Sequence, residues 1–268
     1  MAELIDLHCH LLPGIDDGPP DLVEALAMAR IAVADGIKVT ACTPHIYPGL
    51  YKNETAGIRT AIAALRVALR VEGIDLELVE GADIHLAPDM LQRLRAGEIP
   101  TLAGSRYFLF EPPHHIAPPR LEESVFALLT AGYVPIVTHP ERLTWIEGHY
   151  GTFERLVRSG AWMQVTAGSI TGRFGGRTRY WAERLLDDRL VHIVATDAHR
   201  AKQRSPLLAE ARDAVAGRLG DAEALNQVRV RPQGVLQNKA PSELPPLPAI
   251  PHTSSSKMGF LRRLLGGA

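Results

Sequence analysis

The chain has 268 residues, of which 29 are lysine or arginine and 30 are aspartate or glutamate, so its formal net charge is −1. Hydrophobic residues make up 46% and charged residues 22% of the sequence, which is typical of a globular protein and excludes a disordered or fibrous one. The near-neutral balance argues against a nucleic-acid partner, because such binders gain most of their affinity by neutralising phosphates.

Two features predict a cytoplasmic protein. The sequence has only two cysteines, Cys9 and Cys42, which is typical of unpaired thiols in a reducing compartment. The N-terminus has neither the basic segment nor the long apolar segment of a secretory signal. No apolar stretch reaches the roughly 18–20 residues that are needed to cross a bilayer.

Short apolar runs alternate with helical patterns along the chain. The expected strands are 4–7, 39–42, 76–84, 107–110, 135–138, 162–166 and 192–195. The expected helices are 20–35, 54–71, 88–96, 120–131, 151–159, 177–187 and 206–219. Strands that are apolar on both faces and alternate with helices indicate a parallel sheet covered by helices. Seven such units predict an α/β fold, a distorted (β/α)7 barrel of the TIM type, with a doubly wound open sheet as the alternative.

The composition changes at about residue 232. Six prolines between positions 232 and 251 are followed by three serines, which predicts an extended tail. We therefore expect one domain over residues 1–231 and a tail over 232–268. The last residues, 258–268, form a short cationic amphipathic segment. This segment has two possible interpretations: a frayed terminus, or a weak contact with a membrane surface or a partner.

Histidines and carboxylates recur where the expected strands end. They are His8, His10, Asp16, Asp17, His45, Asp83, Glu111, His139, Asp197 and His199. Residues two apart in a strand point to the same side, so His8 and His10 reach into one cavity. Each residue alone is ambiguous, because a single histidine is more often structural. Parallel barrel strands, however, open their carboxyl ends on one face, and the set as a whole predicts one site there.

The ligand types indicate which ions such a site prefers. Mixed imidazole and carboxylate ligands suit manganese, zinc, iron or cobalt more than calcium. Five histidines and four carboxylates, with only one of the neighbours Asp16 and Asp17 counted, are too many for one ion and fit two or three. Three divalent ions, four carboxylates and one hydroxide leave a positive charge, which attracts an anionic group with oxygen ligands, and phosphate fits best.

With these motifs the sequence resembles the PHP (polymerase and histidinol phosphatase) metallophosphoesterases. It is most similar to their capsule and exopolysaccharide branch, the CpsB/YwqE-like manganese-dependent protein-tyrosine phosphatases. The resemblance covers about residues 3–235, and its motifs are 6–19, 43–45, 81–84, 106–111, 139–142 and 195–199. An Asp-x-His-x-His motif alone would indicate only a broader class of metal-dependent barrels.

The resemblance implies the following metal ligands. The first ion is expected on His8, His10, Asp83 and Asp197, the second on Asp83, Glu111 and His139, and the third on Asp17, His45 and His199. Mn²⁺ is the implied metal, with Zn²⁺, Fe²⁺ or Co²⁺ as alternatives. The branch usually has glutamate where this chain has Asp83, so the reach of this ligand is shorter by one methylene. His85 is expected at the rim.

The resemblance also implies the reaction. Arg142 and Arg204 are expected to face the phosphate and, with His139, to be the catalytic residues. The expected reaction is hydrolysis of phosphotyrosine by metal-activated hydroxide, with the tail of a bacterial tyrosine kinase of capsule synthesis as partner. A small-molecule phosphatase or phosphodiesterase and a catalytically impaired metal-binding regulator are the alternatives. A thiol phosphatase is excluded, because arginine does not follow either cysteine at the required six positions.

Overall fold

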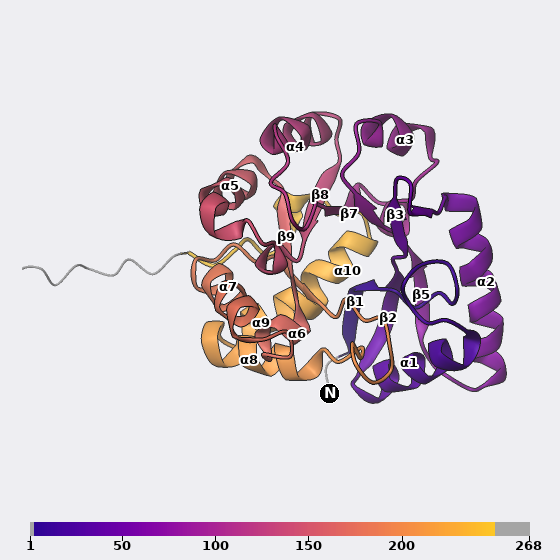
Figure 1. Cartoon of the computed structure of the whole chain (residues 1–268). Coiled ribbons are helices and arrows are strands. Elements are labelled where there is room, and N and C mark those ends of the chain that lie inside the picture. Colours follow the sequence, from indigo (N-terminus) through magenta and orange to yellow (C-terminus); the bar gives the residue numbers. More distant parts are fainter. Residues whose placement is uncertain (1–2, 250–268) are drawn as a thin grey trace, which may run out of the picture.

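Two β-sheets with helices on their outer sides form the described part of the chain (Figure 1). The structure is a computed structural model and describes residues 3–249. The smaller sheet contains, in spatial order, β1 (Leu4–Cys9), β2 (Ile37–Cys42) and β5 (Glu77–Glu80). The larger sheet contains, in spatial order, β10 (Ile193–Ala195), β9 (Trp162–Thr166), β8 (Val134–Thr138), β7 (Tyr107–Glu111), β6 (Asp83–His85), β3 (His45–Tyr47) and β4 (Tyr51–Lys52). All strand pairs are parallel except the β3–β4 hairpin.

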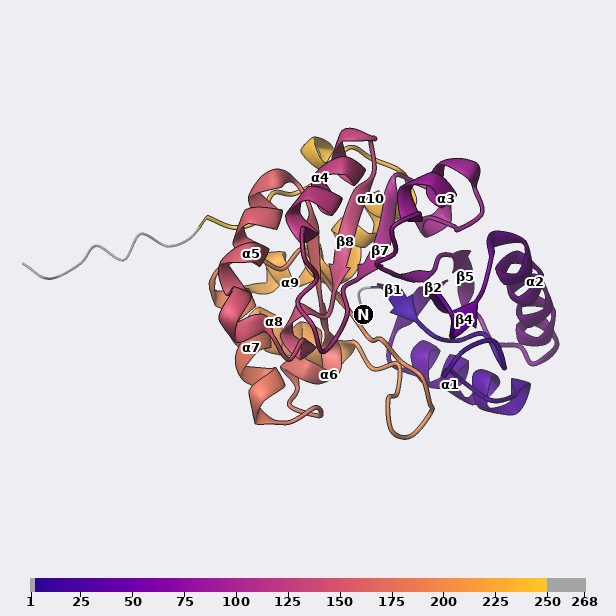
Figure 2. The same ribbon diagram turned by 45° about the horizontal axis from the view of Figure 1, so that its top comes forward.

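Helices cover the outer faces of both sheets. In the N-terminal half, α1 (Leu22–Ala34) contacts β2 and α2 (Thr55–Val71) contacts β5 (Figure 2). Four more helices follow along the larger sheet: α3 (Met90–Ala96), α4 (Leu121–Thr130), α5 (Ile146–Ser159) and α7 (Gly176–Asp187). The remaining helices are α6 (Ala167–Ile170), α8 (Ala209–Leu219), α9 (Asp221–Leu225) and α10 (Arg231–Leu236). Short helical turns lie at Leu102–Gly104, Pro140–Arg142, Asn226–Val230 and Pro241–Glu243.

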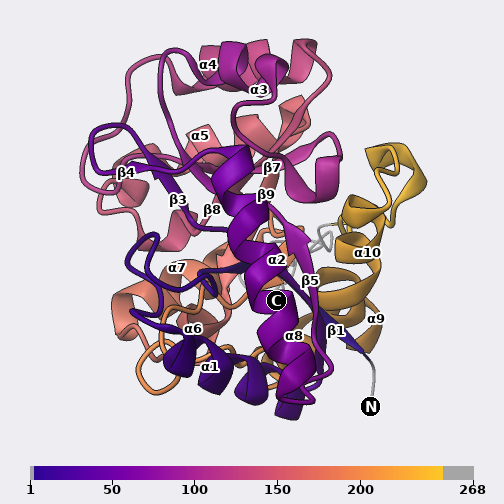
Figure 3. The same ribbon diagram turned by 90° about the vertical axis from the view of Figure 1, so that its right-hand side faces the viewer.

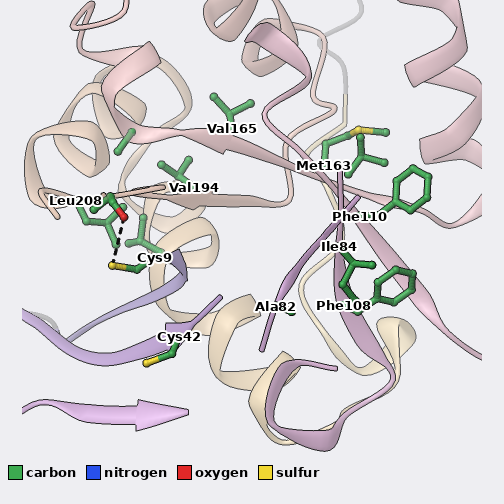
Figure 4. Packing of buried hydrophobic residues seen from close by; sticks show 14 of the residues in the cluster. Cys9, Cys42, Ala82, Ile84, Phe108, Phe110, Met163, Val165, Val194 and Leu208 are labelled. Carbon is green, nitrogen blue, oxygen red and sulfur yellow. Dashed lines mark hydrogen bonds between the residues drawn. The ribbon is translucent and has the colours of Figure 1, made fainter. Parts of the chain in front are cut away.

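The alternation of side chains along the strands divides the hydrophobic core into two clusters. In β7, Phe108 and Phe110 pack in the outer cluster beneath the helices, whereas Tyr107 and Leu109 pack in the inner cluster between the sheets. This is the period of two that a strand imposes. Figure 4 shows part of the outer cluster, including Phe108, Phe110 and Cys42. Every residue of β1, β7, β8 and β9 is buried, as expected for strands that are apolar on both faces.

One predicted strand is in fact two strands in different sheets. The expected strand 76–84 is interrupted after β5, and the chain crosses at Gly81 to β6 in the larger sheet. A Cβ atom at Gly81 would lie 2.8 Å from the Leu102 side chain and 3.0 Å from that of Thr43, so the crossing requires glycine. The prediction that Asp83 and His45 end strands is therefore wrong, because they begin β6 and β3.

The observed fold is a mixed α/β fold. Within residues 3–249 the strands form two sheets, and no continuous ladder closes them into one barrel. The sheets approach each other where β1 ends, since Cys9 forms a bridge with Ala198 and His10 N donates to Ala198 O at 2.9 Å. Figure 3 shows β3 and β4 on one side of the molecule and α9 and α10 on the other.

The expected domain boundary at residue 232 falls inside α10. The fully buried Arg231 donates to the carbonyl oxygens of Pro245 at 2.9 Å and Pro246 at 2.8 Å. Leu244 is also buried, in the inner cluster, so residues 231–246 pack on the domain. The cationic segment 258–268 lies outside the described residues. In residues 3–249, none of the helices has the length and apolar character of a membrane span.

Candidate metal centre

The nine predicted ligands lie together at one end of the sheets, where β1, β7, β8 and β10 end and where His45 and Asp83 begin β3 and β6. Their donor atoms fall into overlapping groups of three or four, each within 4.8 Å. One group contains the whole predicted third set, Asp17, His45 and His199, whereas the first and second sets are brought together without Asp83. The groups are His8 with His10 and Asp197; His10 with Asp17, His45 and His199; His45 with Asp83 and Glu111; and Glu111 with His114 and His139. They border a cavity of about 480 Å³.

The two histidines of β1 and the loop that follows it are oriented from behind. His8 Nδ1 lies 2.8 Å from Gln164 Oε1, and His10 Nδ1 lies 2.8 Å from Asp16 Oδ2. These hydrogen bonds turn both Nε2 atoms toward the centre, 3.2 Å apart, in the way that outer hydrogen bonds fix metal-ligating histidines. Asp16 was recognised only as a neighbour of Asp17. Gln164 was missed, because nothing in the sequence relates β9 to β1.

Asp197 links the first donor group to the two arginines. Its Oδ1 lies 3.4 Å from His8 Nε2 and 3.5 Å from His10 Nε2. Its Oδ2 accepts a hydrogen bond from Arg204 at 2.6 Å and another from Arg142. Asp197 has φ +50°, a strained conformation for a residue with a Cβ atom and one that clusters at functional sites.

Both predicted arginines line the cavity. The Arg142 guanidinium lies 5.2 Å from the ring centre of Phe174, and that of Arg204 lies 6.0 Å away. These distances are those of cation–π contacts. Phe174 therefore supports the arginines and lies outside the set of residues that line the cavity.

Asp83 and Glu111 face the remaining histidines. Asp83 Oδ2 lies 3.4 Å from His8 Nε2, 3.6 Å from His45 Nδ1 and 3.9 Å from His139 Nε2. Glu111 Oε2 lies 3.4 Å from His45 Nδ1, and its Oε1 lies 3.7 Å from His139 Nε2. His139, with φ +36°, is a second strained residue at the site.

Asp17 completes the outer side of the cavity. Its Oδ1 lies 3.2 Å from His199 Nε2 and 3.6 Å from His45 Nε2. The side chain of Asp17 is 46% exposed, so this donor group is the one nearest to solvent. His199 is oriented through its Nδ1, which lies 3.0 Å from Asp197 O.

The spacing of the donor atoms fits divalent ions. Most separations are 3.2–3.6 Å, longer than the usual N–H···O distance of about 2.9 Å. Two ligands that are each about 2.1 Å from an ion, at tetrahedral or octahedral angles, are about 3.0–3.4 Å apart. In addition, Asp83 Oδ2, His45 Nδ1 and His199 Nε2 are buried without a hydrogen-bond partner among the described residues.

The carboxylates control the protonation of the histidines in the ion-free chain. Burial alone would lower the pKa of His8, but Asp83 and Asp197 outweigh burial and raise it to about 9. Burial is likewise outweighed at His45, where the nearby carboxylates of Glu111 and Asp83 raise the pKa to about 10. Protons therefore occupy positions at these two histidines that a cation can take.

Burial has the larger influence on the pKa of His139 and His199, whereas neighbouring cations have the larger influence on the pKa of Asp197. Burial and the charge of Arg142 lower the pKa of His139 to about 4, and burial and His10 lower that of His199 to about 4. Burial raises the pKa of the Asp197 carboxyl, but Arg204, His8 and Arg142 outweigh it and hold the pKa well below its usual range. The Asp197 carboxyl therefore stays deprotonated and negatively charged.

Two further histidines contact Glu111. His85, which was expected at the rim, lines the cavity; it is 9% exposed, and its Nδ1 lies 3.5 Å from Glu111 Oε2. Strand parity was the signal that could have placed it. The Nε2 of His114 lies 3.3 Å from Glu111 Oε1, and its backbone is hydrogen-bonded to Thr144. No sequence pattern predicts this loop contact.

The chain is similar to known proteins over most of its length. Residues 4–237 match the family described as "Capsular polysaccharide synthesis, CpsB/CapC". The tyrosine-protein phosphatase YwqE of Bacillus subtilis (strain 168) is 38% identical over 202 residues, which cover 75% of this chain and 80% of that protein. The tyrosine-protein phosphatase CpsB of Streptococcus pneumoniae is 27% identical over 241 residues, which cover 88% and 99%.

Comparison with solved structures agrees with the sequence comparison. A crystal structure from work on YwqE of Bacillus subtilis and CpsB of Streptococcus pneumoniae, described as "unique metal-dependent tyrosine phosphatases", superimposes with a TM-score of 0.86 at 34% identity. The match covers 92% of this chain and 99% of that one. The phosphotriesterase homology protein of Escherichia coli, with phosphate in its active site, has a TM-score of 0.57 at 11% identity and shows a shared fold only.

Proposed function

Because the chain belongs to the CpsB/CapC family of capsular polysaccharide synthesis, we propose that it is a metal-dependent tyrosine-protein phosphatase. The resemblance inferred from the sequence motifs is thereby confirmed. The observation that carries the function is the convergence, at one cavity, of metal-type donor groups with two arginines. Cations and arginines together suit a phosphate dianion.

The assignment of the side chains follows from their positions. His8, His10, Asp17, His45, Asp83, Glu111, His139, Asp197 and His199 hold two or three divalent ions, with Mn²⁺ as the favoured metal. Bound ions supply Lewis-acid stabilisation of the phosphoryl oxygens and lower the pKa of water. Arg142 and Arg204 both reach Asp197, so their guanidinium groups lie beside a residue that would hold an ion and would stabilise charge on the transferred phosphoryl group.

The mouth of the cavity suits an aromatic leaving group. Tyr47, Leu50 and Tyr51 come from the β3–β4 hairpin, and Pro113 and Ile116 from the loop after β7; all five line the cavity. Leu50 is 63% and Ile116 is 73% exposed, so apolar surface is available to a substrate ring. A phenolate, with a pKa of about 10, also leaves more readily than an alkoxide.

The proposed substrate is the phosphotyrosine tail of a bacterial tyrosine kinase that acts in capsule or exopolysaccharide synthesis. We place the reaction in the cytoplasm, which is supported by two buried free cysteines of the kind kept reduced there. We further propose that the two sheets are a distorted (β/α)7 barrel, which the Cys9–Ala198 bridge supports.

Removal of metal tests this function. Dialysis against EDTA is expected to abolish hydrolysis of a phosphotyrosine peptide, and Mn²⁺ or Co²⁺ to restore it, because the ions hold the phosphate. Full activity in chelator would refute the metal mechanism. Comparison of a phosphorylated kinase tail with histidinol phosphate tests the substrate class, and preference for histidinol phosphate would overturn it.

A further inference from the structure

We propose that His114, on the loop between β7 and α4, is a ligand of the second ion, together with Glu111 and His139. The inference rests on the metal centre of the proposed function and goes beyond the ligand set that the sequence implied. In that set, Asp83 was the third ligand of this ion.

The first observation is the geometry around Glu111 Oε1. His114 Nε2 lies 3.3 Å and His139 Nε2 lies 3.7 Å from this oxygen. The two rings approach it together, with centroids 4.8 Å apart. The three side chains form a donor group within 4.8 Å. Both nitrogen–oxygen distances are longer than an ordinary hydrogen bond. The His114 distance falls within the separation of about 3.0–3.4 Å expected for two ligands of one ion, and the His139 distance is somewhat longer.

The second observation is the position of Asp83. Its Oδ2 is nearer to His8 Nε2, at 3.4 Å, than to His139 Nε2, at 3.9 Å. Asp83 belongs to the donor group of His45 and Glu111, and it is absent from the group that contains His139. An ion between Glu111 and His139 therefore finds its third protein donor in His114.

The third observation is that the loop holds His114 in place. The carbonyl oxygen of His114 accepts hydrogen bonds from Thr144 N at 3.0 Å and Thr144 Oγ1 at 3.1 Å. Trp145 Nε1 donates to the carbonyl oxygen of Pro113 at 2.8 Å. Pro112 and Pro113 restrict the backbone further. A ligand ordered before the ion binds loses little conformational entropy on coordination.

The adjacent His115 provides a matched control. It lines the same cavity, but it is exposed and belongs to none of the donor groups found among the described residues. His114, by contrast, is 28% exposed. Replacement of either residue removes one imidazole from the same loop. Only His114→Ala removes a nitrogen that lies next to the Glu111 carboxylate.

The experiment measures metal binding directly. Wild type, His114→Ala and His115→Ala are stripped with EDTA, titrated with Mn²⁺, and analysed for bound metal by mass spectrometry. The expected result is that His114→Ala binds one ion at least tenfold more weakly, while His115→Ala binds as wild type does. With Co²⁺, the visible absorption band is expected to change only in His114→Ala, because one nitrogen ligand is lost.

Equal Mn²⁺ affinity and equal Co²⁺ spectra in both variants would overturn the assignment, whatever happens to turnover. A thermal melt in EDTA shows whether each variant is folded, and since no ion is present there, the three proteins are expected to melt alike. A wild type that binds no Mn²⁺ or Co²⁺ would instead refute the metal centre itself. Failure of the ligand assignment and failure of the proposed function are thus distinguishable.

Discussion

The two ends of the strands bury charge in opposite ways. At the amino ends, Arg231 is fully buried, forms an ion pair with Glu223 at 2.7 Å and donates to the carbonyl oxygens of His192, Pro245 and Pro246. At the carboxyl ends, the buried donor atoms stand 3.2–3.6 Å apart, and several have no hydrogen-bond partner among the described residues.

This difference separates a structural charge from a functional one. Buried charge is costly unless it is paired and hydrogen-bonded. At the amino ends the protein itself supplies these partners, so the network is complete. At the carboxyl ends the donor atoms surround positions that a cation can occupy. The comparison predicts that substitutions at the amino ends act on stability, whereas those at the carboxyl ends act on metal binding and catalysis.

The largest effect is expected from Arg231→Met. The substitution leaves Glu223 buried without its cation, and loss of one partner of a buried pair costs about 3–5 kcal/mol. Urea unfolding monitored by circular dichroism measures the loss. The Mn²⁺ affinity of the folded fraction is expected to stay unchanged. A variant as stable as wild type would show that the two ends do not differ in this way.

Arg142→Ala is expected to act on the chemistry. Loss of one donor to the developing charge typically lowers kcat about 100-fold, or about 3 kcal/mol in the barrier. Steady-state kinetics on a phosphotyrosine peptide measure this effect, while bound metal stays near the wild-type level. Arg158→Ala, which removes a 71% exposed arginine, is the control and should be neutral. An unchanged kcat in Arg142→Ala would remove this residue from catalysis.

The smallest effect, taken over a single pH unit, is expected from pH. In the ion-free chain the pKa of His8 is raised to about 9 and that of His45 to about 10, against about 6.5 in the unfolded chain. Their contribution to stability is complete below pH 6.5 and is lost as pH rises through 9 and 10. Stability should fall on the order of 1–2 kcal/mol per pH unit above pH 7.

The Mn²⁺-loaded protein should show the opposite slope over the same range. Metal ligation requires deprotonated histidines, so binding strengthens as pH rises. Thermal melts of both forms between pH 7 and pH 9, at fixed ionic strength, make the comparison. Parallel slopes would mean that His8 and His45 do not exchange protons for cations.

The features that could be predicted from the sequence are those that depend on the periodicity of apolar residues. The seven expected helices and most of the strands are present, because apolar patterns and glycine or proline signals are local. Residues that follow strands could be placed at one rim because parallel strands share a direction. For this reason His8 and Asp197 were associated with one site although the sequence separates them widely.

The remaining features depend on tertiary contacts. The chain leaves β5 for β6 at Gly81, where the side chains of Leu102 and Thr43 lie close, and no local pattern encodes these contacts. His114 reaches Glu111 because Thr144 and Trp145 hold its loop. Arg231 was assigned to the boundary of a proline-rich tail, and its burial depends on partners as distant as His192.

The buried Arg231 clamp has a practical consequence. Its hydrogen bonds hold residues 245 and 246 at the amino ends of the strands, where Leu4 also begins β1. The cavity opens at the opposite ends of the strands. Leu4 and Pro246 therefore both lie on the side of the domain opposite to the cavity. A carrier protein or a solid support attached close to either of these residues will leave the cavity mouth open to a bulky phosphoprotein.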